Sequence, residues 1–84
     1  MIKKPIIIQL ASGLEPRPVA VLVQVASQYN SKIYVEDGDR KVNAKSIMGM
    51  MTLALAPGET VTVYADGADE EKAIQSIEQY LSAK

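Results

Sequence analysis

Two short stretches of the chain place polar and charged side chains where helices are expected to begin. Residues 13–18 read G-L-E-P-R-P and set the carboxylate of Glu15 two positions before the guanidinium of Arg17. Further along, the hydroxyl of Ser46 follows Lys45 and precedes an apolar run. Free amide hydrogens at a helix start attract anions, so both places could hold a phosphate. The simpler alternatives are a weak surface ion pair at the first place and a plain N-cap at the second.

The residue types that the chain lacks exclude several kinds of chemistry. It contains no cysteine and no histidine. Disulfides, thiolate metal sites, the commonest general base and a phosphoryl-carrying imidazole are therefore excluded, which argues against an enzyme and against a metal or cofactor site. Nine basic residues against ten acidic ones give a net charge of −1. Without a basic excess, no direct nucleic-acid partner is expected.

Length and composition predict one domain over residues 1–84. The chain has 84 residues, of which 48% are hydrophobic, and leaves no room for a second core. Its start, M-I-K-K-P-I-I-I-Q-L, has too few apolar residues for a signal peptide or a spanning helix. The lack of cysteine suits a reducing compartment. We expect a cytoplasmic protein with no membrane partner.

Hydrophobic periodicity predicts the order β-α-β-β-α-β-α. Strands are expected over 3–10, 32–36, 41–43 and 60–65, and helices over 16–29, 46–53 and 69–84. Pro5 cannot donate a ladder hydrogen bond, so the first strand is placed at a sheet edge. The order favours an α+β fold in which helices cover one face of a mainly antiparallel, four-stranded sheet and the other face meets water.

Helical spacing also predicts which side chains are buried. The first helix should bury Val19, Leu22, Val23 and Ala26, and the last should bury Ala73, Ile74, Ile77 and Leu81. In the short helix, one or two of Ile47, Met48 and Met51 should face away from the sheet, with Leu53 and Leu55 filling the core; the alternative is that all three are buried.

Two further groups favour a structural explanation over a site. The acidic residues Glu36, Asp37 and Asp39 surround a glycine, but they lack the spacing of a calcium loop and fit a hairpin turn at Asp37-Gly38. The four tyrosines are scattered along the sequence, so they are expected to cover the core or its rim and not to form a stacking platform for bases.

The whole chain resembles the HPr family of the phosphoenolpyruvate-dependent sugar phosphotransferase system. The resemblance rests on the element order, on Arg17-Pro18 and on the stretch N-A-K-S-I-M-G-M-M at residues 43–51. It implies the HPr-like open-faced β-sandwich, with three helices on one face. In that family the signature G-(I/L)-H-A-R-P carries a phosphoryl group on its histidine, received from enzyme I.

Two departures from this signature imply that phosphoryl relay is lost. Glu15 stands at the histidine position, and an ionised carboxylate repels phosphate at neutral pH. Pro16 stands where the family usually has alanine, which removes one backbone amide from the helix start. If Glu15 is the N-cap, both Pro16 and Pro18 are tolerated in the first turn. Enzyme I is then at most a partner without productive transfer.

Ser46 matches the regulatory serine of HPr proteins from Gram-positive bacteria, which an HPr kinase/phosphorylase modifies with ATP. The resemblance is closest in logic to Crh proteins, HPr-like proteins of carbon catabolite repression that lack the carrier histidine. It implies that phosphorylated Ser46 lets the protein bind a LacI-type catabolite control repressor as corepressor. Crh proteins usually have glutamine at the carrier position, so Glu15 either weakens docking or imitates a charged carrier, and the sequence leaves this open.

The resemblance also implies a docking face built by the first helix and the short helix. The anion and partner contacts that it implies are Glu15, Arg17 and Lys45. The partner-binding residues of the face are Ala20, Val21, Gln24, Ile47, Met48, Gly49 and Met51. Two other functions stay open: a phosphocarrier protein by family membership, and an HPr-like binding module that uses neither phosphorylation. A monomer or a weak homodimer is expected, because the edge strand near Pro5 leaves pairing possible.

Overall fold

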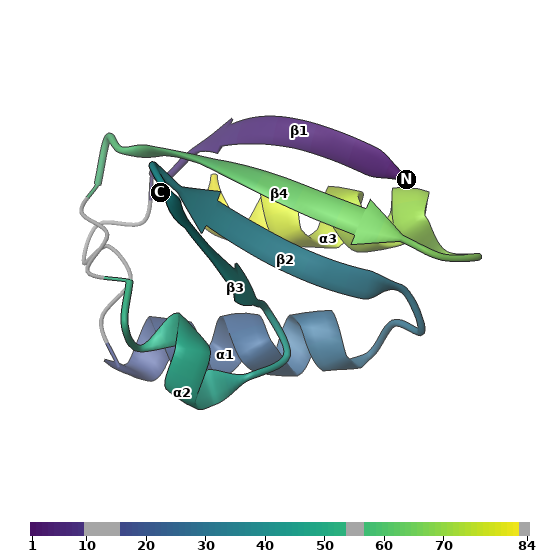
Figure 1. Cartoon of the computed structure of the whole chain (residues 1–84), viewed down its shortest axis with the longest axis horizontal. Helices are drawn as coiled ribbons and strands as arrows, with labels where there is room; N and C mark the ends of the chain where they lie inside the picture. The colour runs from purple at the N-terminus through teal and green to yellow at the C-terminus, as the bar shows by residue number, and fades with distance from the viewer. Residues whose placement is uncertain (10–15, 54–56, 83–84) are drawn as a thin grey trace.

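The structure, a computed structural model, describes residues 1–9, 16–53 and 57–82, with residues 16–18 described by their backbone alone. Within these ranges the elements are β1 (Ile2–Ile7), α1 (Pro16–Ser27), β2 (Lys32–Asp37), β3 (Arg40–Asn43), α2 (Ile47–Met50), β4 (Thr60–Asp66) and α3 (Glu70–Leu81) (Figure 1). The predicted order β-α-β-β-α-β-α is confirmed.

The four strands form one sheet in the order β1-β4-β2-β3. Every pairing between neighbouring strands is antiparallel. Strand β1 lies at one edge, where Pro5 is opposite Thr62 of β4. The edge position predicted from Pro5 is therefore confirmed, since its missing amide hydrogen leaves no central ladder bond unmade.

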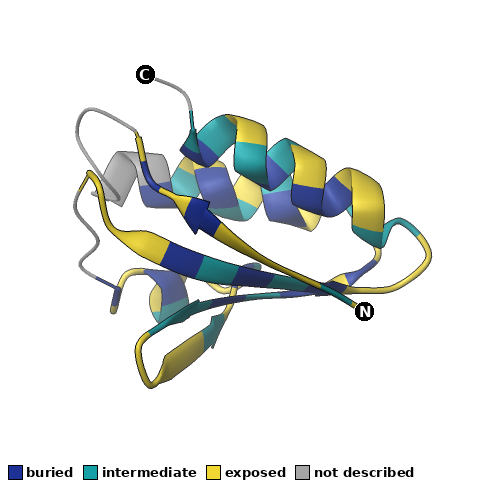
Figure 2. Ribbon diagram, turned by 90° about the horizontal axis from the view of Figure 1, so that it is seen from above, coloured by how far each residue is buried: buried dark blue, intermediate teal, exposed yellow. Residues whose placement is uncertain are grey.

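Burial alternates along the strands, as a sheet with one covered face requires. In β4 the buried residues Val61, Val63 and Ala65 alternate with exposed or half-buried ones, and Figure 2 shows the same alternation as bands of colour along the ribbon. The three helices cover one face, and the other face is open to water. The fold is thus α+β with the predicted layers.

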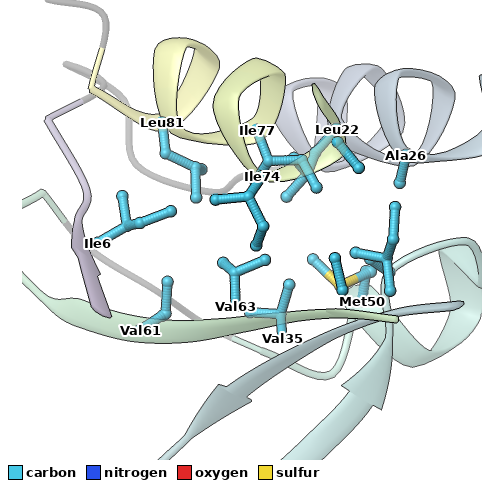
Figure 3. Close-up of a cluster of buried hydrophobic side chains, with 14 of the residues drawn as sticks. Ile6, Leu22, Ala26, Val35, Met50, Val61, Val63, Ile74, Ile77 and Leu81 are labelled. Carbon is cyan, nitrogen blue, oxygen red and sulfur yellow. The ribbon is translucent and has the colours of Figure 1, made fainter. Parts of the chain in front are cut away.

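The core lies between the sheet and the helices (Figure 3). Helix α3 buries all four predicted residues, and α1 buries Val19, Leu22 and Ala26, whereas Val23 is half-buried against the core. Met50 of α2 is fully buried, which the sequence analysis did not predict. Leu53 is buried as predicted, and Leu55 lies outside the described residues.

Several element ends differ from the prediction. Strand β1 ends at Ile7; the Ile8 amide still donates to the Glu59 carbonyl, and the Gln9 amide then donates to the Leu81 carbonyl at the end of α3. Helix α1 ends at Ser27 and not at Tyr29. Helix α2 is one turn long, with Met51 as its C-cap. Helix α3 ends at Leu81, three residues before the predicted end.

The β2–β3 hairpin turns one residue later than predicted. Asp37 pairs with Arg40, so the two loop residues are Gly38 and Asp39, with Gly38 at φ 62°. A positive φ at the first loop residue favours glycine there. In the hairpin, Asp37 is paired with Arg40 and Asp39 is a loop residue. Within the ranges that the structure describes, no group of three His, Cys, Asp or Glu side chains that could hold a metal ion is found.

The start of α3 is tied to the loop that follows α1. Asp69 is the N-cap, yet its carboxylate does not cap its own helix. It accepts hydrogen bonds from the Asn30 amide at 2.9 Å, from the Ser31 amide at 3.0 Å and from the Ser31 hydroxyl. Gly67 makes this approach possible, because a Cβ there would lie 2.7 Å from the Ser31 Cα.

These hydrogen bonds also change the acidity of Asp69. The Ser31 hydroxyl, followed by the Asn30 amide, stabilises the ionised carboxylate and holds the pKa of Asp69 below its ordinary value. Ser31 is fully buried, so its amide and hydroxyl depend on this carboxylate for their partner. The contact therefore links two distant parts of the chain through one acidic side chain.

Candidate functional site

Ser46 lies on the surface, immediately before α2. Its backbone is extended at φ −104° and ψ 110°, and its hydroxyl oxygen accepts a hydrogen bond from the Gly49 amide at 3.2 Å. The Met50 amide donates to the Ser46 carbonyl at 2.9 Å and starts the helical turn. The predicted N-cap is confirmed. The hydroxyl makes this one local contact and remains accessible to another molecule.

Gly49 controls the space beside that hydroxyl. A Cβ at Gly49 would lie 3.4 Å from the Ser46 Oγ and 3.6 Å from the Val42 Cβ. These are contact distances, so alanine would fit, but its methyl group would cover part of the serine oxygen. A glycine inside a helix weakens it by about 0.5–1 kcal/mol relative to alanine. Glycine at this position thus leaves the space beside the Ser46 oxygen open.

Lys45 is held by the fold. Its Nζ donates a hydrogen bond to the Tyr29 carbonyl at 2.6 Å, and its own amide donates to Asn43 Oδ1 at 2.8 Å. The half-buried side chain therefore joins the segment before α2 to the loop after α1. This structural contact was missed in the sequence, because the two residues are sixteen positions apart. Anion contact by Lys45 stays a prediction.

Four exposed apolar side chains lie on α1, on α2 and at the C-cap of α2, and the two helices contact each other (Figure 1). They are Val21, Ile47, Met48 and Met51, and we call them the α1–α2 patch. The exposed fractions of the last three are 43%, 80% and 56%. All three are exposed, whereas the sequence predicted that one or two of them would face away from the sheet. The alternative, in which all three are buried, is wrong.

The reason is that α2 has other residues to bury. Met50 and Leu53 fill the core beneath the helix, so the remaining apolar residues of this segment are left on the outside. Exposed methionines on a surface suit adaptable contacts with another molecule, because the thioether chain is flexible and polarisable. That these side chains form an interaction surface stays a prediction.

The other predicted docking residues are placed as follows. On α1, Ala20 is half-buried and Gln24 is exposed. Gln24 lies four residues after Ala20 and three after Val21, and residues three or four apart share a face of a helix. Pro16 is the first residue of α1, as predicted. The side chain of Arg17 is not described, and Glu15 lies outside the described residues. The predicted anion site at the start of α1 therefore stays a prediction.

The open face of the sheet carries a cluster that the sequence did not predict. Tyr34 and Tyr64 are opposite each other on β2 and β4, and the Lys41 Nζ lies 5.2 Å and 4.1 Å from their ring centres. The Tyr64 hydroxyl donates to Glu36 at 2.7 Å, and this bond to a carboxylate is the main cause that raises the pKa of Tyr64. The strand register brings these residues together.

The tyrosines therefore divide into two kinds. Tyr29 and Tyr80 pack against the core, as the sequence suggested, whereas Tyr34 and Tyr64 form cation–π contacts on the open face. Only knowledge of the strand register could have paired the latter two in advance.

Among the helices of the described ranges, none has the length and apolar character needed to cross a membrane.

Comparison with known proteins shows which family the chain resembles. The family model described as "PTS HPr component phosphorylation site" matches residues 2–83. The HPr-like protein Crh of Halalkalibacterium halodurans is 41% identical over 81 residues, which cover 96% of this chain and 96% of that protein.

Two solved structures are also similar to this chain. The phosphocarrier protein HPr from Bacillus anthracis has a TM-score of 0.92 at 38% identity, and the match covers 95% of each chain. The catabolite repression protein Crh of Bacillus subtilis, described as a domain-swapped dimer, has a TM-score of 0.76 at 41% identity and covers 96% of this chain and 93% of its own.

Proposed function

The chain belongs to the HPr family, and from this membership we propose that it is a regulatory protein of carbon catabolite repression. Its likeness to HPr-like proteins of the Crh type supports a non-catalytic role. In the proposal, HPr kinase/phosphorylase phosphorylates Ser46, and the product binds a LacI-type catabolite control repressor as corepressor in the cytoplasm. The observation that carries the proposal is the exposed Ser46 hydroxyl within N-A-K-S-I-M-G-M-M.

Phosphorylation at Ser46 is compatible with the contacts that this residue makes. The hydroxyl oxygen attacks the γ-phosphorus of ATP, ADP leaves, and the hydroxyl proton is lost to the kinase. Only the local bond from the Gly49 amide involves this oxygen, so the new group displaces no core side chain. A phosphate adds about −1.5 to −2 charges at pH 7, which are favoured at the start of a helix. The modification then acts as a change of surface charge.

The α1–α2 patch supplies the second half of the proposal. A partner that buries Ile47, Met48 and Met51 gains hydrophobic contact, and a basic group on that partner gains the charge of phosphorylated Ser46. The two contributions come from neighbouring residues of one segment. The apolar contact is available whether or not Ser46 is phosphorylated, so only the phosphate distinguishes the two forms. Docking of the repressor would therefore depend on the kinase.

Phosphocarrier activity is the competing function, since HPr of Bacillus anthracis is a phosphocarrier protein. The sequence argues against it. The chain has no histidine, so no phosphohistidine can form, and Glu15 stands at the carrier position. Pro16, the first residue of α1, contributes no amide hydrogen to a phosphate. We propose that enzyme I, if it binds at all, transfers nothing.

Intact-mass spectrometry after two incubations tests the proposal. One sample receives phosphoenolpyruvate and enzyme I, and the other receives ATP and HPr kinase/phosphorylase. We expect one added phosphate in the second sample alone, and none in a Ser46→Ala variant treated in the same way. A phosphate added by enzyme I would overturn the argument about Glu15, and no phosphate in either sample would favour a binding module that uses neither modification.

Repressor binding is tested with the phosphorylated protein. We expect the LacI-type repressor to bind the kinase-treated protein and to bind the untreated protein and treated Ser46→Ala much more weakly. Equal affinity for all three samples would contradict a corepressor role. Sedimentation of the same samples measures the oligomeric state, for which we propose a monomer or a weak homodimer.

A further inference from the structure

Methionine carries all the sulfur chemistry of this chain, which has four methionines and no cysteine. Three of them, Met48, Met50 and Met51, lie in or next to α2, and they differ sharply in burial. Met48 and Met51 are exposed, whereas Met50 has no exposed surface and points into the core in Figure 3. Helix geometry explains the sorting, because residues three apart share a face and residues two apart do not.

We infer that Met48 and Met51 form an oxidation site at which peroxides convert the thioethers to sulfoxides and so weaken docking of HPr kinase/phosphorylase. This inference rests on the proposed function, in which HPr kinase/phosphorylase modifies Ser46. Exposed Ile47 and Met48 directly follow Ser46, so a kinase that encloses the serine hydroxyl also contacts the α1–α2 patch. In the reaction a sulfur lone pair attacks one oxygen of hydrogen peroxide. The S–O bond forms as the O–O bond breaks, the attacked oxygen passes its proton to the departing hydroxide, and water leaves. Sulfur loses two electrons, and the peroxide gains them.

The selectivity follows from access to the sulfur atoms. A peroxide molecule can reach the exposed thioethers directly, whereas Met50 is covered by the helices and the sheet on all sides. No thiol within the chain competes for the oxidant. We therefore expect oxidation to stop at the two exposed residues of the patch while the protein stays folded.

Met1 provides an internal reference for oxidant dose. It is also exposed, but it lies away from the α1–α2 patch, with its amino group 3.3 Å from Glu70 and 3.8 Å from Asp66. Its sulfoxide should form as readily as those of the patch and leave docking unchanged. Comparing the extent of oxidation at the three exposed residues thus separates general damage from an effect of the patch.

Oxidation at the patch changes docking more than folding. The sulfoxide is polar, and at an exposed residue it stays hydrated in the folded protein, so the fold loses nothing. A partner that covers the residue must remove this water without supplying an equivalent hydrogen bond. Methionine sulfoxide reductases reverse the step, because two thiols become a disulfide and the sulfoxide oxygen leaves as water. The site is therefore reversible.

The first measurement maps oxidation residue by residue. The purified protein is treated with increasing hydrogen peroxide, the reaction is stopped with catalase, and peptides are sequenced by tandem mass spectrometry. We expect Met48 and Met51 to oxidise severalfold faster than Met50, with an unchanged circular dichroism spectrum. Equal rates at all three residues in the folded protein would overturn the site.

The second measurement uses the same samples as substrates for HPr kinase/phosphorylase. We expect the rate of Ser46 phosphorylation to fall at least about tenfold, the change that 1.4 kcal/mol of lost docking free energy produces. Treatment with a methionine sulfoxide reductase and dithiothreitol should restore the rate. An oxidised sample that is phosphorylated at the untreated rate would overturn the docking effect and leave the proposed function intact.

Variants identify the residues responsible. Each variant is compared with its own untreated sample, because replacing a docking side chain changes the starting rate as well. Peroxide should no longer lower the rate of Met48→Leu/Met51→Leu, whereas the Met50→Leu control should keep the full sensitivity. If the untreated wild-type protein is not phosphorylated at all, the proposed function and the docking effect both fail, and the peptide map alone decides whether the oxidation site exists.

Discussion

The residues that precede α2 and α3 are both typical N-caps, yet the structure uses them in opposite ways. Ser46 bonds to an amide of its own helix and is otherwise open to solvent. Asp69 leaves its own helix uncapped and instead accepts three hydrogen bonds from residues 30 and 31. A cap that serves one local turn can be modified without loss of the fold, whereas a cap that joins distant segments cannot.

This comparison gives a physical reason why the proposed regulatory role is assigned to the start of α2 and not to the start of α3. Both positions have favourable electrostatics for a negative charge, since each precedes the amides of a helix. At α3 that charge is already present as a carboxylate and is committed to Asn30 and Ser31. At α2 the charge is absent until a phosphate is added. The same local pattern therefore serves stability at α3, and in the proposed function it carries the signal at α2.

The largest expected effect is the loss of the Asp69 contact. In Asp69→Ala, the buried amide and hydroxyl of Ser31 lose their acceptor, so we expect a fall in the urea midpoint several times larger than that of Ser46→Ala. The matched control is Asp66→Asn, an exposed carboxylate whose nearest cation, the N-terminal amine, is 3.8 Å away. Similar midpoints for the Asp69 and Asp66 variants would show that the contact does not join the two segments.

Acid should remove the same contact in the wild-type protein. Because the pKa of Asp69 is lower in the folded state, the unfolded chain binds more protons between the two pKa values, and stability rises with pH in that window. The contribution is complete above about pH 4, the ordinary range of an aspartate, and is lost as the pH falls through the lowered value.

Urea unfolding between about pH 2 and pH 5 measures this dependence. We expect the difference in unfolding free energy between wild type and Asp69→Asn to shrink as the pH falls, since both side chains become neutral. Glu70, whose pKa is also lowered, mainly by the Gly67 amide, remains in both proteins and cancels in the comparison. A difference that stays constant over this range would contradict the assignment of the pH effect to Asp69.

The two regions also differ in what the sequence could predict. The N-cap role of Ser46 was predicted, because it depends on neighbouring residues alone. The element order and the buried stripe of α3 were predicted for the same reason, since periodicity is a local property. The Asp69 contact, the Lys45 to Tyr29 bond and the pairing of Tyr34 with Tyr64 all depend on tertiary register, which no local pattern contains.

The exposure of the α1–α2 patch also shows that local patterns cannot fully predict burial. Periodicity correctly left some of Ile47, Met48 and Met51 outside, but it could not tell that Met50 would take the buried position in α2. That outcome depends on how a helix of one turn sits against the sheet. The site at the start of α1 was inferred from family resemblance, and the structure does not describe Glu15.

A smaller effect is expected on the α2 side of the comparison. Ser46→Ala removes one cap hydrogen bond from an exposed turn, so we expect a loss of about 1 kcal/mol or less in the free energy of unfolding. The chemical denaturation midpoint measures this change. A small loss of stability together with abolished phosphorylation would show that Ser46 acts in signalling and contributes little to the fold. A loss as large as that of Asp69→Ala would instead show that both caps are equally important for stability.

The smallest effect is expected at Gly49, and it should have opposite signs in two measurements. Gly49→Ala adds a methyl group at contact distance from Ser46 and Val42, and removing a helical glycine should stabilise the protein by about 0.5–1 kcal/mol. The same methyl covers part of the Ser46 oxygen, so phosphorylation by HPr kinase/phosphorylase should slow. Gly58→Ala is the control, because open space surrounds Gly58 but its φ of 92° disfavours alanine, so stability should fall there and phosphorylation should stay unchanged. A Gly49→Ala protein that is more stable and is phosphorylated at the wild-type rate would show that access to Ser46 does not depend on this glycine.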